Sequence, residues 1–326
     1  MHRRGFLKST TSVGLAAALP DIAHAPSAGG RIGSDVPRRL QQRTARLRRL
    51  DDVLGGGDTY RTYLSEYHHT RGLLRDGSYT QDTGRGLLSV LAEQAQQAGW
   101  AAFDSGRHAE ARGLYEASHK AAQQAEDAQL AGNALAFLAY QQLPTDRQAG
   151  VQVAARSCAT AGPHAAPGVR ALLYERLAWA HAVAGQADET EHALEAAHDA
   201  LAEADDAPQP DWASWVDSTE LQIMTGRCWT ELGRPLRAVP VLETALSQYD
   251  NRHARDKSLY LSWLARAYLQ AGEVEQAARV TDQALDLSSG VASVRPRERL
   301  APVLKRLAEH RSLPKVAALL DKARAA

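Results

Sequence analysis

A pattern that recurs along most of this sequence constrains its fold more than any other feature. Each copy begins with a helical segment that carries an apolar, a small and then a large residue, and a turn follows. A second helical segment places a bulky residue four positions after an alanine, and a small residue three positions further on. The turns fall at residues 106, 144, 185, 233, 272 and 312. Because one hairpin cannot bury its apolar face alone, the pattern predicts helical hairpins that stack in series.

Composition favours a fold made of helices. The chain has 61 alanines among 326 residues, whereas isoleucine and valine together number 20. Alanine is the best helix former and β-branched residues favour strands, so we predict an all-α protein. Cationic and anionic residues number 38 each, which argues against a dedicated nucleic-acid binder. No run of 18 apolar residues occurs, so we expect no transmembrane helix.

The small residues of the pattern predict where two paired helices cross. In the first repeat Gly99 lies before the turn, and Tyr115 supplies the bulky side chain of the second helix. In the fifth repeat we expect Ala277 and Ala284 to be buried at the closest crossing. A glycine in the turn ends the first helix and lets the second fold back.

The first domain that we predict, residues 1–25, has the parts of a secretory signal. A charged start, a weakly apolar middle and an Ala-x-Ala site at residues 23–25 follow one another. Arg3, Arg4, Phe6 and Leu7 also fit the twin-arginine motif, which directs folded proteins to export. The alternative is a short N-terminal helix that never meets a translocase.

Residues 26–58 form a linker followed by one basic helix, and the repeats occupy residues 59–326. We predict the helix from residue 37 to residue 54, ended by the glycines at 55–57, with Asp58 as the cap of the next helix. The arginines of this helix either contact an anionic surface or form a solvated face balanced by Asp51, Asp52 and acidic neighbours. The second interpretation is favoured, since no aromatic residues are interleaved with the arginines. The arginines stand at positions 38, 39, 43, 46, 48 and 49.

Two resemblances follow from these motifs. Leu264, Ala265 and Tyr268, like Gly226 with Trp229, are similar to the signature of tetratricopeptide repeats, over about residues 85–326. The resemblance implies a right-handed solenoid of antiparallel helix hairpins, with repeats longer than the family's usual 34 residues. The extra residues fall between hairpins, at 162–168 and 205–211.

A closer resemblance is to the C-terminal region of bacterial helix-turn-helix (XRE-type) transcriptional regulators. It is carried by residues 47–56, which read LRRLDDVLGG, and by residues 99–107, which read GWAAFDSGR. Those regulators join a DNA-binding domain to a tetratricopeptide-like region that binds a partner, often with an Arg-Arg-x-Phe-Leu stretch between the two. Only two residues precede Arg3 here, so we expect no direct DNA binding. The same stretch is internal in that family, which weakens the export interpretation.

We find no catalytic or metal-binding motif. The sequence has no H-E-x-x-H, P-loop, G-x-S-x-G or G-x-G-x-x-G pattern, and Cys158 and Cys228 match no metal-ligand spacing. We therefore expect a protein that is not an enzyme and that has no cofactor.

The expected binding surface is the concave face formed by the first helices of the repeats. Six residues before successive turns stand Trp100, Trp179, Arg227 and Arg266, and ten residues before two of the turns stand Gln96 and Glu175. We expect these side chains to be exposed in a groove that binds a peptide with an apolar and an acidic segment. The alternative is that both tryptophans pack between repeats.

The function that we expect is a non-catalytic module that binds a protein or peptide partner, as the regulator-like resemblance implies. The alternative is an accessory protein exported by the twin-arginine pathway that uses the same repeats outside the cytoplasmic membrane. A cytoplasmic location is slightly favoured.

Overall fold

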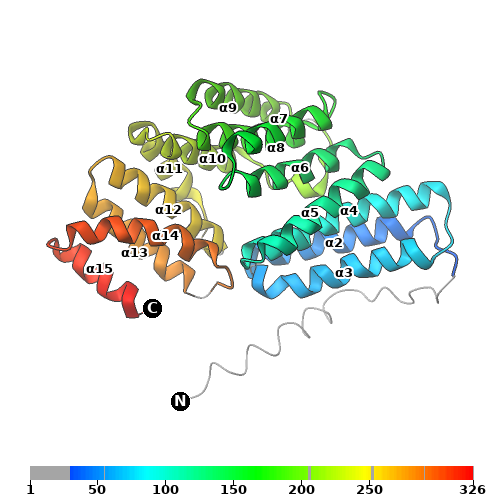
Figure 1. The fold of residues 1–326 in the computed structure, drawn as a ribbon, viewed down its shortest axis with the longest axis horizontal. Coiled ribbons are helices and arrows are strands. Elements are labelled where there is room, and N and C mark those ends of the chain that lie inside the picture. Colours follow the sequence, from blue (N-terminus) through cyan, green and yellow to red (C-terminus); the bar gives the residue numbers. More distant parts are fainter. Residues whose placement is uncertain (1–29, 55, 205–206, 251–252, 290, 326) are drawn as a thin grey trace, which may run out of the picture. The chain divides into compact units, whose positions relative to one another are not determined.

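The computed structural model describes residues 30–54, 56–204, 207–250, 253–289 and 291–325, and these residues are almost entirely helical (Figure 1). Across these ranges there are 14 α-helices and no strand, apart from one isolated bridge between Arg31 and Ser78. The all-α prediction is confirmed. The twin-arginine residues Arg3, Arg4, Phe6 and Leu7 lie outside the described ranges. None of the helices that the structure describes has the length and apolar character needed to cross a membrane.

The chain divides into two compact units, within the region that the sequence predicts as a single repeat domain. Unit 1 ends at Ala134 and unit 2 begins at Leu135, so the boundary lies inside α6 (Ala128–Gln142). Unit 1 otherwise contains α2 (Val36–Leu54), α3 (Gly56–Asp76), α4 (Gln81–Asp104) and α5 (His108–Gln124). Unit 2 contains α7 (Arg147–Ala161), α8 (Pro167–Val183), α9 (Ala187–Ala202), α10 (Ser218–Glu231), α11 (Pro235–Gln248), α12 (Ala254–Gln270), α13 (Val274–Ser288), α14 (Arg295–Leu307) and α15 (Pro314–Ala325).

Four helix pairs share the same turn. The pairs α4–α5, α8–α9, α10–α11 and α12–α13 are each joined through a glycine with φ between 68° and 82°. The residue after this glycine donates its backbone N–H to a carbonyl five positions back, as in Arg107 to Ala102 and Glu273 to Tyr268. Glycine adopts positive φ without steric cost and so ends the first helix in each pair. The glycines stand at 106, 185, 233 and 272, so these four turn predictions are confirmed.

The predicted close crossings are also present. A Cβ atom on Gly99 would lie 2.5 Å from Cε1 of Tyr115, and one on Gly226 would lie 2.4 Å from Cγ of Leu242. At these two crossings the first helix therefore has no side chain, and a bulky side chain of the second helix fills the space. In the pair α12–α13 the small residue is on the second helix, where Ala277 is 0% exposed as expected.

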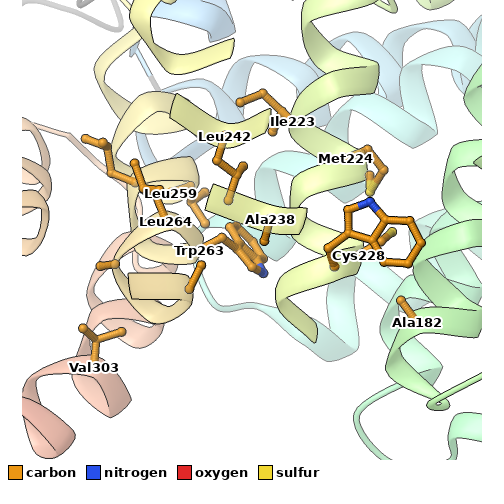
Figure 2. Packing of buried hydrophobic residues seen from close by; sticks show 14 of the residues in the cluster. Ala182, Ile223, Met224, Cys228, Ala238, Leu242, Leu259, Trp263, Leu264 and Val303 are labelled. Carbon is orange, nitrogen blue, oxygen red and sulfur yellow. The ribbon is translucent and has the colours of Figure 1, made fainter. Parts of the chain in front are cut away.

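The core of unit 2 runs along the first helices of its pairs. The first helices pack against one another, α8 against α10 and α10 against α12, and α12 packs in turn against α14. Figure 2 shows Leu259, Trp263 and Leu264 of α12 beside Ala238 and Leu242 of the preceding pair. Side chains at equivalent positions of successive first helices are thereby brought close to one another.

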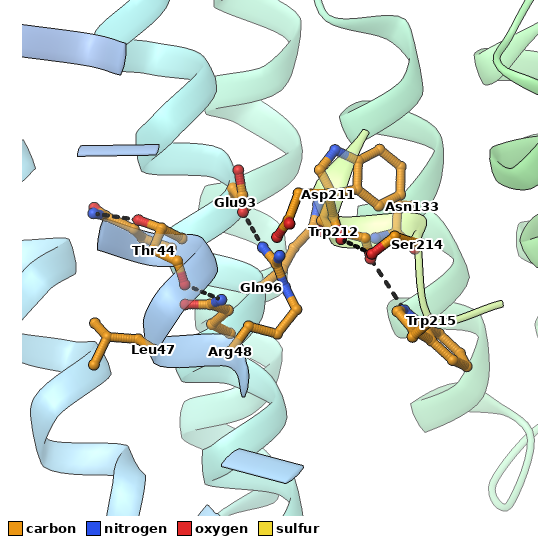
Figure 3. A network of polar contacts seen from close by, with 12 residues as sticks. Thr44, Leu47, Arg48, Glu93, Gln96, Asn133, Asp211, Trp212, Ser214 and Trp215 are labelled. Atoms are coloured by element: carbon orange, nitrogen blue, oxygen red, sulfur yellow. Dashed lines mark hydrogen bonds and ion pairs between the residues drawn. The ribbon is translucent and has the colours of Figure 1, made fainter. Parts of the chain in front are cut away.

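The basic helix α2 packs in unit 1 through one face, which buries Leu40, Thr44 and Leu47, while Arg38, Arg39, Arg46 and Arg49 are exposed. Arg43 donates two hydrogen bonds to the carboxylate of Glu66, at 2.8 and 3.0 Å, and Arg48 pairs with Glu93 (Figure 3). These partners are the acidic neighbours that the favoured interpretation required. Helix α3 begins at Gly56, so Asp58 lies in its first turn and the prediction that Asp58 precedes the helix as its cap is wrong.

The close crossing in unit 1 gives a prediction with an internal control. Gly99→Ala should lower the free energy of unfolding by roughly 1–3 kcal/mol, because the added methyl group overlaps the buried ring of Tyr115. Gly113→Ala, in the paired helix, meets nothing within 4 Å and should raise it by about 0.5–1 kcal/mol through helix propensity. Denaturant unfolding of both variants measures the difference, and equal effects would contradict the crossing.

Candidate functional site

A stack of two arginines and two tryptophans lies among the first helices of unit 2. The guanidinium carbon of Arg227, on α10, lies 4.7 Å from the ring centre of Trp179 on α8 and 4.2 Å from that of Trp263 on α12. Arg299, on α14, lies 4.0 Å from the ring centre of Trp263. The two indole rings meet edge to face, with centroids 5.9 Å apart. We call these four residues the Arg–Trp stack.

Arg227 is the most enclosed cation of the stack. It is 3% exposed, so the expectation that its side chain is exposed is wrong. The reason is that the first helices pack directly against one another, and the tryptophans of both neighbouring helices cover the guanidinium group. A cation between aromatic faces gains about 2 kcal/mol or more when water is excluded, which offsets part of its desolvation. Nε and Nη2 of Arg227 are buried without a hydrogen bond.

Arg299 extends the stack to α14, which packs against α12. Its pKa is lowered to about 10, chiefly by burial and also by the cations Arg266 and Arg227, whereas Glu231 and Tyr140 oppose the shift. Arg299 therefore keeps its charge at neutral pH. Its Nε also has no hydrogen-bond partner.

Glu175 is one helical turn from Trp179 on the same face of α8, and it is 0% exposed. Neither carboxyl oxygen accepts a hydrogen bond, and the nearest cationic atom is Nε of Arg176 at 3.6 Å. Burial raises the pKa of Glu175 to about 8; Glu220 adds to the shift, whereas Arg176 and Arg227 oppose it. Burial outweighs the ion pair, so the carboxyl group is mainly protonated at neutral pH.

The neighbouring carboxylates have stronger partners than Glu175 has. The hydroxyl of Tyr260 donates to Glu220 at 2.7 Å, and Arg266 donates to Glu231 at 2.6 Å. The guanidinium group of Arg266, which the sequence predicted in the groove, therefore binds a carboxylate of the adjacent helix α10. These hydrogen bonds engage the neighbouring carboxylates but leave Nε and Nη2 of Arg227 and Nε of Arg299 without a hydrogen bond.

The pKa of Tyr140, on α6, is shifted by the arginines around the stack. Burial alone would raise its pKa, but four arginines outweigh that effect and lower the pKa to about 8. They are Arg295, Arg227, Arg176 and Arg299, in order of decreasing effect. The arginines therefore create a positive potential at the position of Tyr140, which favours an anionic group there.

The stack gathers polar atoms that are buried and lack hydrogen bonds. Such an atom costs about 1–3 kcal/mol, and native proteins contain few of them. A bound group that accepts hydrogen bonds would satisfy the donors of this set. The atoms belong to Glu175, Arg227, Trp263 and Arg299.

The structure brings together three of the residues selected from sequence, Trp179, Arg227 and Glu175. Trp179 is 7% and Glu175 0% exposed, so the expectation that these two are exposed is wrong as well. The structure adds Trp263 and Arg299. The sequence pattern does not select them, because they do not lie six or ten residues before a turn. Trp263 is three residues before Arg266 and thus on the same face of α12, so searching a whole helical face would have found it.

The other two selected residues, Gln96 and Trp100, lie in unit 1. The amide nitrogen of Gln96 donates to Ser118 and to the carbonyl of Leu130, both at 3.0 Å, and its oxygen accepts from Asn133 at 2.7 Å (Figure 3). Gln96 is 5% exposed and ties helices together, so the expectation that it is exposed is wrong. Trp100 stacks on Phe103, with ring centroids 5.7 Å apart.

In the part of the chain that the structure describes, no cluster of three or more histidine, cysteine, aspartate or glutamate residues could hold a metal ion. No protein-family model matches the chain, and no curated protein does so.

The protonation of Glu175 gives a prediction about stability. The unfolded chain releases this proton near the usual pKa of 4.5, whereas the folded protein keeps it to about 8. The folded state thus binds more protons in this window, and its stability must fall as the pH rises through it. Glu175→Gln cannot ionise, so its melting temperature relative to wild type should increase from about pH 5 to about pH 8.

The control is Glu191→Gln. Glu191 is exposed, and a hydrogen bond from Arg237 lowers its pKa, so this variant should show no such increase. Parallel pH profiles for wild type and Glu175→Gln would show that Glu175 is ionised in the folded protein.

Proposed function

We propose that this protein is a non-catalytic binding module that holds a peptide segment of a partner on the first helices of unit 2. The single observation that carries the proposal is the set of buried polar atoms without hydrogen bonds at the Arg–Trp stack. Those atoms come from the successive first helices α8, α10 and α12 and from α14, which packs against α12. A ligand that spans several repeats is the kind of partner that such a row can contact.

The proposal includes the architecture implied by the sequence resemblance. Helices that pack in adjacent pairs, joined by four equivalent glycine turns, support a right-handed tetratricopeptide-like solenoid with a concave binding face. The resemblance to XRE-type regulators supports a regulatory role for binding. Peptide recognition by the first helices would join these two expectations.

The chemistry of the stack supports a peptide over a bulk surface contact. Trp179 and Trp263 provide an apolar, water-excluding environment, and the guanidinium group of Arg227 lies between them with two unpaired donors. Aromatic and arginine side chains supply most of the energy of protein interfaces when they are desolvated. A segment with one acceptor group flanked by apolar residues matches this arrangement.

The test uses an array of short synthetic peptides of random sequence, followed by isothermal titration of those that bind. Arg227→Met should weaken binding by more than tenfold, which corresponds to about 1.4 kcal/mol or more. Arg227→Lys should also weaken it, because an ammonium group keeps the charge but loses the fork.

Arg237→Met is the matched control. Arg237 lies 3.7 Å from the ring centre of Trp229, so this variant also removes a cation from an aromatic face, but on the second helix α11. Its affinity should equal that of wild type. An array without any binding peptide, or equal losses in Arg227→Lys and Arg237→Met, would contradict the proposal.

A further inference from the structure

The donors at the Arg–Trp stack are of a kind that one chemical group satisfies. Nε and Nη2 lie on the same edge of a guanidinium group, and in Arg227 both are buried without a partner. This edge is the one that binds the two oxygens of a carboxylate in parallel. Nε1 of Trp263 is a further buried donor without a partner, on a ring that Arg227 contacts.

Glu175 lies on α8, the helix that packs against the Arg227 helix α10. It shares one face of α8 with Trp179, and Trp179 in turn contacts Arg227. A carboxyl group that carries a proton donates a hydrogen bond, whereas an ionised one only accepts. Two ionised carboxylates at one buried site would repel each other, so an acidic ligand group requires Glu175 in its protonated form.

We infer that the bound peptide places a carboxylate on the Nε and Nη2 edge of Arg227, and that this carboxylate binds together with a proton carried by Glu175. The inference rests on the proposed function, since it names the chemistry of the same site. The carboxylate is either the C-terminus of the peptide or an aspartate or glutamate side chain. No covalent bond changes: the ligand oxygen accepts a hydrogen bond from the Glu175 hydroxyl.

A cationic ligand group fits the site less well. The two oxygens of Glu175 would suit an amine only if the carboxyl group were ionised, and burial opposes that. The positive potential that lowers the pKa of Tyr140 also opposes a second cation. The anion is therefore the group that both the donors and the potential favour.

The pH dependence expected from Glu175 must be distinguished from that of the other titratable groups around the stack. The charges that shift the pKa of Glu175 come from Arg176 of its own helix and from Glu220 and Arg227 of α10. Helices α7 and α9 also pack on α8, but no group on them contributes to this shift. Tyr140 of α6 titrates in the same pH range. Further groups near the stack are Glu231 on α10, Tyr249 after α11, Asp256, Tyr260 and Arg266 on α12, and Arg295 and Arg299 on α14.

The first experiment identifies the ligand group. A peptide that binds on the array is compared with its C-terminal amide and with versions in which each acidic residue is replaced by its amide. One of these changes should weaken binding at least tenfold, and it tells whether the terminus or a side chain supplies the carboxylate. If native protein binds the peptide and none of the changes weakens it, the inference fails while the proposed function stands.

Acetate, acetamide and sulfate serve as competitors of that peptide. Acetate should displace it, whereas acetamide, which has the same shape without the charge, should not. Displacement by sulfate as strong as that by acetate would show a general anion site and overturn the assignment to a carboxylate.

The second experiment measures the coupled proton. Affinity in wild type should be constant below about pH 8 and should fall by about tenfold for each pH unit above it. Titration at about pH 9 in buffers of different ionisation enthalpy should show uptake of up to one proton for each peptide bound. Glu175→Gln should bind across this range without the fall and without proton uptake.

Tyr140→Phe is the control for the second titrating group. It should keep both the fall in affinity and the proton uptake, because Glu175 is intact. If both effects vanish in Tyr140→Phe and persist in Glu175→Gln, the proton belongs to the tyrosine and the inference is overturned.

Discussion

Close packing of paired helices is the constraint on which the rest of this structure depends. At Gly99 and Gly226 the first helix presents no side chain, and the ring of Tyr115 or the side chain of Leu242 fills the space. A larger residue at either position would push the two helices apart. The pairs must be this tight for each first helix to reach the next one, as α8, α10 and α12 do. Only then do side chains from different repeats meet at the Arg–Trp stack.

The sequence predicts the pairs, their turns and their close crossings because these features repeat. Gly106, Gly185, Gly233 and Gly272 carry a local signal, since a positive φ is a property of one residue and its neighbours. Burial of Ala277 follows equally from its place in the pattern. Local backbone preference and helical periodicity thus account for most of what could be predicted of the fold.

The composition of the candidate site could be predicted only in part. Trp179, Arg227 and Glu175 follow from equivalent repeat positions, but their burial does not, because it depends on the rings contributed by neighbouring helices. Trp263 and Arg299 occupy other offsets from their turns and join the stack through the packing of α12 and α14. The pairing of Arg266 with Glu231 likewise depends on which carboxylate the adjacent helix presents. Contacts between distant segments do not appear as a spacing in the sequence.

The distribution of the stack over several helix pairs limits how this protein can change in length. Solenoids commonly gain or lose whole repeats, because each repeat contacts only its neighbours. Here α8, α10, α12 and α14 each contribute a residue to one cluster, so the order and number of the pairs between Pro167 and Leu307 are tied to it. Duplicating or deleting one pair would keep a continuous hydrophobic core but would separate Trp179 from Arg227, or Arg227 from Trp263. The contacts of the cluster therefore constrain the number and the order of the helix pairs in this segment.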